Sequence, residues 1–262
     1  MKFKKFGDKN KPAIILLHGG GLSWWSYKNV LDKLQAKYYV VLPIIDGHGE
    51  DGASTFISIQ DSARKLIAYI DRELCGKVFL LGGLSIGAQI VTEVLSIRKD
   101  ISSYGIVESA LLYPIKGTKL LTVPSYRVFY GLIRREWFSK LQAKTLSVPE
   151  NMFLIYYNDS LKITKESLIN IALSNGNYYI KDSIKETTAN ILIISGEKEL
   201  KIMKKSAEYL HKLIPNSELY LAKGCSHGEL SLKYYEQYLK LIKDFIENTN
   251  RIEVKGDIHD KT

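Results

Sequence analysis

One short stretch near the middle of the chain limits what the sequence can fold into more than any other. Residues 78–84 form an apolar run typical of a buried strand, Ser85 lies within Gly-Leu-Ser-Ile-Gly, and the following residues have the pattern of a helix. A residue at so sharp a strand-to-helix turn has strained backbone angles, and small neighbours are needed two positions before and after it. Ser85 is therefore a candidate nucleophile, which needs a base, an acid and an oxyanion site from the rest of the chain.

The segments around this stretch alternate between two patterns. Continuous apolar runs predict buried strands, and apolar residues spaced by three and four predict helices between them. The expected strands are residues 12–17, 38–45, 78–84, 104–112, 190–195 and 218–222. The expected helices are residues 24–37, 57–74, 86–98, 201–214 and 229–248. This alternation predicts the fold class α/β, with a doubly wound, mostly parallel sheet.

The alternation is interrupted once, after Pro114, and resumes near Ala189. The residues between them contain helix-like segments rich in aromatic side chains, which could simply pack against their own neighbours. The interruption begins where a strand delivers the chain to the sheet edge that holds Ser85, so we expect a helical cap over that edge, formed by residues 114–187. The α/β core would comprise residues 1–113 and 188–248. The charged residues 249–262 are expected to form a flexible tail.

The composition argues against several classes of partner. The formal net charge is +9, but the basic residues are scattered apart from a light cluster at the N-terminus, so we expect no nucleic-acid partner. No apolar run approaches membrane-spanning length, and we expect no membrane partner. Two cysteines are too few for a disulfide framework, and the N-terminus does not have the pattern of a signal peptide. The expectation is a cytoplasmic monomer or homodimer that acts on a small-molecule substrate.

We expect no cofactor and no metal. Neither glycine cluster satisfies Gly-x-Gly-x-x-Gly, because the sixth position counted from Gly19 is Trp24, which excludes the dinucleotide fingerprint. Histidines and cysteines do not occur with the spacing of zinc ligands, and Cys225 is better explained as a small buried residue.

The base should be one of five histidines. His18 and His48 lie in glycine-rich turns after strands, where a role in bracing the loop is expected. His211 falls inside a helix, and His259 lies in the tail. His227 lies directly after the last strand of the parallel sheet, at the edge where such sheets meet their ligands. His227 is therefore the candidate base.

The acid should come between Ser85 and His227, at the end of the penultimate strand. Glu199 is preferred because, three residues after the glycine that ends this strand, the chain has turned back towards the sheet edge. Glu197 is expected to point away or to cap the next helix. Glu108, late in the preceding strand, is a third candidate, since an acid one strand earlier could also reach the histidine.

An acyl intermediate also needs hydrogen-bond donors for its oxyanion. Two backbone N–H groups suit this role: that of Ile86, at the helix start after Ser85, and that of Gly20, in the glycine run after the first strand. The alternative for the glycine run is a merely tight turn. The substrate pocket is expected to be largely apolar, with Gly21, Trp24, Tyr126, Phe129 and Trp137 as candidate lining residues.

Nearly the whole chain, apart from the tail, resembles the α/β-hydrolase fold superfamily, in particular its small intracellular capped esterase-like members. The resemblance rests on Leu17-His18-Gly19-Gly20-Gly21, Gly47-His48-Gly49, Gly83-Leu84-Ser85-Ile86-Gly87, Gly196-Glu197-Lys198-Glu199 and Gly224-Cys225-Ser226-His227-Gly228, in that order. Carried over position by position, it implies Ser85 as nucleophile, Glu199 as acid and His227 as base. It also implies Gly20 and Ile86 as oxyanion donors. Such enzymes more often carry Asp at the acid position, so the choice among the three glutamates stays open.

The function that this resemblance implies is hydrolysis of an ester through an acyl-enzyme on Ser85. The same triad could also catalyse carbon–carbon bond hydrolysis, lactone opening or a lyase reaction in which Ser85 and His227 act as base. A protein of a different class, which binds a ligand in this pocket and turns it over slowly, is a further alternative.

Overall fold

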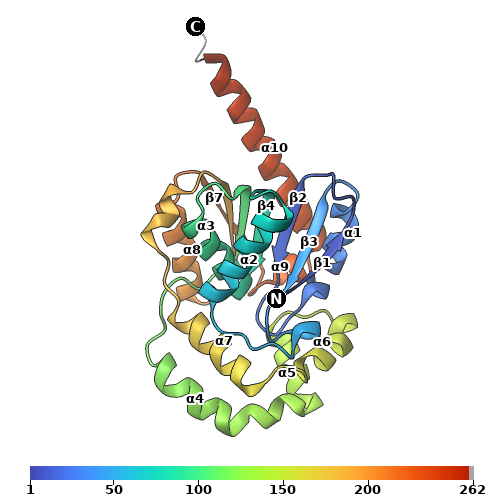
Figure 1. Ribbon diagram of the computed structural model, residues 1–262. Coiled ribbons are helices and arrows are strands. Elements are labelled where there is room, and N and C mark those ends of the chain that lie inside the picture. The colour runs from blue at the N-terminus through green and yellow to red at the C-terminus, as the bar shows by residue number, and fades with distance from the viewer. Residues whose placement is uncertain (260–262) are drawn as a thin grey trace.

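A single seven-stranded sheet runs through the centre of the protein (Figure 1). The computed structural model describes the chain from Met1 to His259, and its side chains as far as Thr249. The strands lie in the order β1-β3-β2-β4-β5-β6-β7, with β1 antiparallel to β3 and every other neighbouring pair parallel. Their bounds are β1 Lys2–Phe6, β2 Ala13–Leu17, β3 Tyr39–Ile44, β4 Val78–Leu84, β5 Ser102–Glu108, β6 Asn190–Gly196 and β7 Ser217–Ala222. The doubly wound α/β sheet expected from the sequence is confirmed.

Strand β2 shows why the central strands are continuous apolar runs. Ile14 and Leu16 point to one face of the sheet, where they pack with residues of α1 and α10. Ile15 and Leu17 point to the other face, where they pack with residues of α2, α3 and α8. Successive side chains of a strand alternate between faces, so a sheet covered on both sides needs an apolar residue at every position. The covering helices are α1 Lys28–Leu34, α2 Ile59–Glu73, α3 Ile86–Ile97, α8 Lys201–Leu213 and α10 Tyr235–His259.

Strand β1 was not expected. Its five residues include three lysines, at positions 2, 4 and 5, and their order does not alternate between polar and apolar. The strand can still form because it lies at the edge of the sheet and pairs only with β3, so that its lysines reach solvent.

Two strand and helix ends also differ from expectation. The strand expected to reach residue 112 ends at Glu108, because Ser109 has a positive φ of 56° that no strand accommodates. The helix expected over 229–248 is a short α9, Glu229–Leu232, followed by α10, which continues to His259. Residues 249–259, expected to belong to a flexible tail, are thus helical, and residues 260–262 lie outside the described part of the chain. No described helix is both long and apolar enough to span a bilayer.

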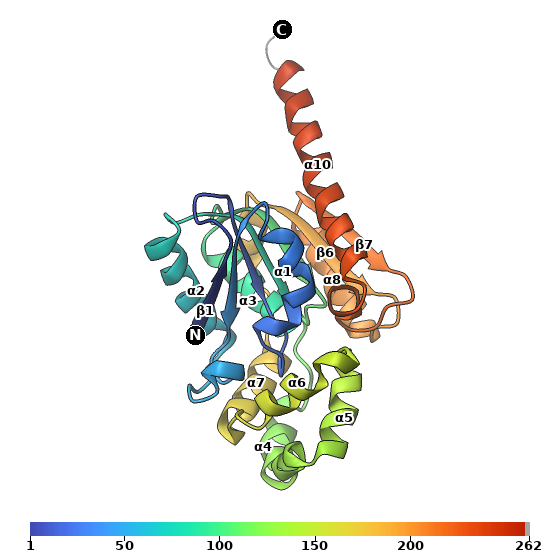
Figure 2. The same ribbon diagram turned by 90° about the vertical axis from the view of Figure 1, so that its right-hand side faces the viewer.

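Between β5 and β6 the chain forms four further helices, which lie below the carboxyl ends of the parallel strands in Figures 1 and 2. They are α4 Thr118–Phe129, α5 Glu136–Thr145, α6 Phe153–Ser160 and α7 Lys165–Asn177. Short 3₁₀ turns complete the structure: η1 Trp24–Tyr27, η2 Gly49–Asp51, η3 Tyr130–Arg134, η4 Glu150–Met152 and η5 Asp182–Glu186. We refer to residues 114–187 as the proposed cap.

Helix α7 attaches the proposed cap to the core. The Ser167 hydroxyl accepts a hydrogen bond from the Phe56 N–H at 3.2 Å, and the Asn170 amide donates to the Phe56 carbonyl at 2.9 Å. One turn further on, the Ser174 hydroxyl accepts from the Ile59 N–H at 3.0 Å. These bonds fix α7 against the loop that precedes α2, whereas α4 packs on the outer side of α7.

The junction of β4 with α3 is a closely packed turn of the sheet edge. A Cβ atom built on Gly83 would lie 2.4 Å from the backbone carbon of Gly87, and one built on Gly87 would lie 2.4 Å from the carbonyl oxygen of Leu17. Such distances are far inside van der Waals contact, so both positions exclude every other residue type unless the backbone moves. The Gly-x-Ser-x-Gly spacing is therefore a packing requirement of the fold.

We expect Gly83→Ala to lower the free energy of unfolding by about 2 kcal/mol or more, because rigid backbone atoms must move to admit the methyl group. Gly131→Ala is the matched control, since a Cβ at that position meets nothing within 4 Å. It should change stability by about 0.5 kcal/mol or less. Urea unfolding followed by circular dichroism measures both, and equal midpoints for the two variants would contradict the packing argument.

Candidate active site

Ser85 occupies the tight turn between β4 and α3. Its backbone angles are φ 55° and ψ −117°, a strained conformation for a residue with a side chain. The turn is held from both sides: the Ser85 N–H donates to the Glu108 carbonyl at 2.9 Å, and the helix begins directly at Ile86. Ser85 is thereby presented at the carboxyl end of the sheet, as its motif predicts.

Ser85 and His227 line the same cavity, which has a volume of about 350 Å³. The floor of this cavity comes from the sheet edge and includes Gly20 and Ile86, and its wall comes from the proposed cap. Most of the wall residues are apolar, and they include Tyr126, Ile133, Leu146, Ile163, Leu168 and Ile171. The cavity therefore offers an apolar environment beside a serine and a histidine.

A hydrogen bond joins His227 to Glu199. His227 Nδ1 lies 2.8 Å from Glu199 Oε1, and the Ser195 hydroxyl donates to Glu199 Oε2 at 2.8 Å. The loops that carry them touch directly, because a Cβ on Gly196 would lie 2.6 Å from the Cys225 carbonyl oxygen. The Lys198 N–H donates to that same carbonyl at 2.9 Å. The close approach of the two loops thus aligns the acid with the histidine.

The environment of Glu199 keeps its carboxylate ionised. Burial acts to raise its pKa, but the hydrogen bond and charge of His227 outweigh burial, helped by the hydroxyls of Ser109 and Ser195. The pKa of Glu199 therefore lies below its ordinary value. An ionised carboxylate accepts a hydrogen bond from Nδ1–H of His227 and stabilises the imidazolium that forms when Nε2 takes up a proton.

The other two candidate acids are engaged elsewhere. Glu197 Oε2 accepts a hydrogen bond from the Gly224 N–H at 2.8 Å, so Glu197 braces the loop after β7. Glu108 Oε1 accepts from the Ser231 N–H at 3.2 Å, at the start of the chain segment leading into α10. Of the three glutamates weighed from the sequence, Glu199 is the one that the structure places on His227.

Glu108 is a fully buried carboxyl beneath the site. Its Oε2 has no hydrogen-bond partner, and the hydroxyl of Tyr238 nearby has none either within the described residues. Burial raises the pKa of Glu108 to about 7, although hydrogen bonds from Ser231 and the charge of His227 act in the opposite direction. This acid is therefore protonated at mildly acidic pH, where an ordinary glutamate would already be ionised.

Two backbone N–H groups border the cavity beside Ser85. The Gly20 N–H has no hydrogen-bond partner among the described residues. The Ile86 N–H is the first of helix α3, a position that has no acceptor within its own helix and carries the positive end of the helix dipole. Both groups are thus free to bind an oxygen with negative charge.

His18 and His48 have the structural roles expected from the sequence. His18 Nδ1 contacts the Gly19 carbonyl oxygen at 2.9 Å, and its Nε2 accepts from the Ile45 N–H at 3.1 Å, which ties the loop after β2 to the loop after β3. Burial and the adjacent His48 ring lower the pKa of His18 to about 3, so the ring is neutral. His48 Nδ1 contacts the Asp46 carbonyl oxygen at 3.0 Å.

Contrary to expectation, three of the five candidate pocket residues do not line this cavity. Trp24 packs against Phe6 and donates from Nε1 to Glu50 at 3.2 Å, away from the cavity. Phe129 and Trp137 point outwards and are 57% and 63% exposed. Their helices turn other residues, Tyr126 of α4 and Gln142 of α5, towards the cavity, so an aromatic residue on a cap helix does not by itself indicate the pocket. Gly21 and Tyr126 do line the cavity.

Helix α7 contributes to the pocket in a way that was not expected from the sequence. Leu168, Ile171, Ala172 and Asn175 line the cavity from this helix. Their spacing of three, one and three residues is the pattern of one helical face, so it could have identified α7 as the helix that faces Ser85.

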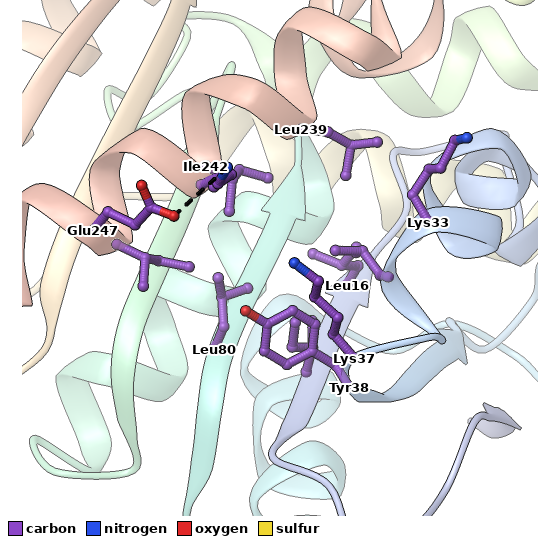
Figure 3. Close-up of a pocket in the computed structure, with 12 residues that line it drawn as sticks. Leu16, Lys33, Lys37, Tyr38, Leu80, Leu239, Ile242 and Glu247 are labelled. Atoms are coloured by element: carbon purple, nitrogen blue, oxygen red, sulfur yellow. Dashed lines mark ion pairs between the residues drawn. The ribbon is translucent and has the colours of Figure 1, made fainter.

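A second, apolar cavity of about 220 Å³ lies between α1 and α10 (Figure 3). Leu16 and Leu80 come from the sheet, Lys33 and Lys37 lie at its rim, and an ion pair of 3.7 Å joins Lys243 to Glu247. Its lining, as far as the side chains are described, contains no serine, cysteine or histidine and therefore no nucleophile–base pair. Among the described residues, no group of three or more His, Cys, Asp or Glu side chains could hold a metal ion.

Comparisons with known proteins agree with the fold. The chain matches the family described as "Alpha/beta hydrolase family" over residues 14–230. No curated protein shows significant sequence similarity to it.

Solved structures show the same architecture. An esterase from Thermogutta terrifontis superposes with a TM-score of 0.75 at 18% identity, covering 94% of this chain and 93% of that one. The enol-lactonase from Burkholderia xenovorans gives 0.77 at 14% identity, over 94% and 96% of the two chains. An esterase from Exiguobacterium antarcticum gives 0.77 at 17% identity, over 94% of each. These similarities establish a shared fold. Together with a family match that begins in β2 and extends beyond His227, they show that the chain belongs to the alpha/beta hydrolase family.

Proposed function

We propose that the protein is a serine hydrolase that cleaves an ester of a small, largely apolar substrate, with Ser85, Glu199 and His227 as its catalytic triad. One observation carries the proposal: a serine in a strained turn and a histidine hydrogen-bonded to an ionised glutamate line one apolar cavity. Family membership supports hydrolysis in general, and the choice of an ester rests on the chemistry of this site.

In the first half of the reaction, His227 Nε2 takes the proton of the Ser85 hydroxyl as its oxygen attacks the ester carbonyl. The negative charge that forms on the carbonyl oxygen is stabilised by the N–H groups of Gly20 and Ile86. One such donor is worth about 3 kcal/mol of transition-state stabilisation. His227 then gives its proton to the departing alkoxide, and the acyl group stays on Ser85 as an ester.

In the second half, a water molecule replaces the alcohol. His227 takes a proton from the water as its oxygen attacks the acyl-Ser85 carbonyl, and returns the proton to the Ser85 oxygen as the carboxylic acid leaves. Glu199 remains ionised throughout and keeps the Nδ1 proton of His227 in place, so that Nε2 is the nitrogen that exchanges protons.

The residues of the cavity wall favour a substrate with an apolar acyl or aryl group rather than a charged metabolite. Its cap residues are mostly aliphatic or aromatic, and none of the described Lys, Arg, Asp or Glu side chains lines it. A bound charge would therefore lose its hydration without gaining a partner, at a cost of several kcal/mol. Gln142, Ser160 and Asn175 are the polar exceptions and could orient one polar group of a substrate.

A lactone is an internal ester, so the same steps would open it, and the product acid would stay attached to its alcohol. Carbon–carbon bond hydrolysis and elimination would use the same residues. A panel of p-nitrophenyl esters of increasing acyl length, with thioesters, lactones and a diketone added, distinguishes these reactions by which member gives the highest kcat/KM. A protein that only binds its ligand would turn over none of them.

Replacing the nucleophile or the base should abolish most of the activity. We expect Ser85→Ala and His227→Ala each to lower kcat on a p-nitrophenyl ester by about 10³-fold or more, because the two act as one unit. A fluorophosphonate probe should label the wild type and should not label Ser85→Ala. Ser125→Ala and His211→Ala, both at exposed positions, serve as matched controls that keep full activity. Wild-type turnover in either triad variant would refute the proposed triad.

The three candidate acids should differ clearly in how much activity is lost when each is replaced by glutamine. We expect Glu199→Gln to lower kcat by about 10²-fold to 10⁴-fold, since a glutamine amide cannot stabilise the imidazolium. Glu197→Gln and Glu108→Gln should each cost less than about tenfold, because neither carboxylate contacts His227. Steady-state kinetics at saturating ester checks the order, and a larger loss at position 108 or 197 would assign the acid differently.

Glu108 should make the free energy of unfolding depend on pH. Its pKa is raised to about 7 in the folded protein, so between about pH 4.5 and 7 the unfolded chain releases a proton that the folded chain retains, and stability falls as pH rises. Glu108→Gln removes this loss. We expect the variant to gain up to about 3 kcal/mol over the wild type at pH 8 and little at pH 4.5. Thermal melts at the two pH values test this, and a pH-independent difference would contradict it.

A further inference from the structure

The outer face of α4 carries apolar side chains that nothing in the described chain covers. Leu120, Leu121 and Val128 are 76%, 64% and 72% exposed, and α4 has no buried residue. Leu121 and Val128 are seven residues apart and therefore lie on one stripe of the helix, and Leu120 lies at the border of this stripe. Figures 1 and 2 place α4 at the end of the molecule opposite to the projecting end of α10.

The next segments extend this exposed apolar character. Phe129, at the end of α4, is 57% exposed, and on α5 Trp137 and Leu141, four residues apart, are 63% and 57% exposed. Single exposed apolar residues are ordinary, but a stripe of them on consecutive helices marks an interaction surface. We call the solvent-facing side of residues 115–149, which include α4, η3 and α5, the outer cap face.

The outer cap face is also strongly basic. Residues 115–149 contain seven basic side chains and one acidic side chain, so they carry +6 of the formal net charge of +9. The acidic residue, Glu136, is already paired with Lys140 at 2.9 Å. In the described part of the chain the other six have no ion-pair partner: Lys116, Lys119, Arg127, Arg134, Arg135 and Lys144.

We propose that the outer cap face binds the surface of a membrane that contains anionic phospholipids. An amphipathic helix lying in the interface buries its apolar side chains at the boundary of headgroups and acyl chains, while flanking Lys and Arg side chains meet the phosphates. Each cation near such a surface contributes about 1 kcal/mol. Both the positive charge and the apolar stripe are thus explained by one partner, an anionic membrane surface.

Other partners fit only one half of this surface. A nucleic acid would satisfy the cations but would leave exposed leucines without a partner. A second copy of the chain could cover the stripe but would bring two faces of +6 together. The sequence-based expectation of no membrane partner rested on the absence of a spanning segment, and surface binding requires none.

The opposite side of the same segments faces the cavity. Tyr126 of α4, Ile133 of η3 and Gln142 of α5 line the cavity that holds Ser85. A membrane bound to the outer cap face would therefore lie one helix away from the candidate active site. The inference goes beyond the proposed function, because binding to a surface can be measured in a protein that hydrolyses nothing.

The test uses the full chain carrying Ser85→Ala, so that no lipid is consumed. Co-sedimentation with vesicles of phosphatidylcholine alone is compared with vesicles that contain about one third phosphatidylglycerol. We expect at least about tenfold tighter binding to the anionic vesicles, weakened by added salt as the charges are screened. Equal binding to the two compositions, or none to either, would overturn the proposal.

Two double variants separate the contributions. Leu120→Gln with Leu121→Gln removes the stripe, and Lys119→Gln with Arg127→Gln removes two cations. Each should weaken anionic-vesicle binding by about fivefold or more. Ile97→Gln and the pair Lys205→Gln with Lys212→Gln change exposed residues on α3 and α8 and should leave binding unchanged. Unchanged binding in both outer-face variants would overturn the assignment.

Competing partners have distinct readouts. Tight binding of a single-stranded oligonucleotide or of polyglutamate that survives Leu120→Gln with Leu121→Gln would show a polyanion site and overturn the lipid assignment. If light scattering shows a dimer that Leu120→Gln with Leu121→Gln converts to a monomer, a second copy of the chain covers the stripe. That result would also overturn the lipid assignment. A monomer that binds only the anionic vesicles supports the proposal.

Discussion

The contact on which the rest of the structure depends is the approach of the first turn of α3 to the end of β2. At Gly87 a side-chain carbon would lie 2.4 Å from the Leu17 carbonyl oxygen, so only glycine lets the helix come this close. This contact fixes the strained turn at Ser85, and it also brings the loop after β2, with the free Gly20 N–H, beside the start of α3. The positions of the proposed nucleophile and of both proposed oxyanion donors thus follow from one packing constraint between two neighbouring parallel strands.

The second constraint acts between β6 and β7. Gly196 allows the two loops that follow these strands to touch, and their contact brings Glu199 onto His227. The other two glutamates near the site have separate roles, since Glu197 holds the loop after β7 and Glu108 is buried beneath it. The pKa values of Glu199 and Glu108 move in opposite directions, because the hydrogen bond and charge of His227 lower that of Glu199 whereas burial raises that of Glu108.

Much of this arrangement could be predicted from the sequence because it depends on local rules. Apolar runs identified six strands, and the position of a residue at the end of a strand was enough to predict that Ser85 and His227 lie at the same sheet edge. The acid stayed open among Glu199, Glu197 and Glu108, because each of these also lies near the end of a strand. Strand β1 was missed because lysines can occupy an edge strand. Trp24, Phe129 and Trp137 were misplaced because the direction in which a side chain points depends on which stripe of its helix is buried, and only packing between distant helices decides that. The periodic face of α7 was the signal that could have located the pocket wall.

Within the proposed cap, α7 and α4 differ in what they contact. The serine and asparagine side chains of α7 are hydrogen-bonded to the loop before α2 and to the start of α2, and its apolar face lines the cavity, so its sequence is tied to both the core and the cavity. Helix α4 rests on α7, and most of its surface meets only solvent. Substitutions on the outer side of α4 therefore leave the hydrogen bonds that attach the proposed cap intact, so the surface proposed to bind a membrane can change among relatives independently of the cavity.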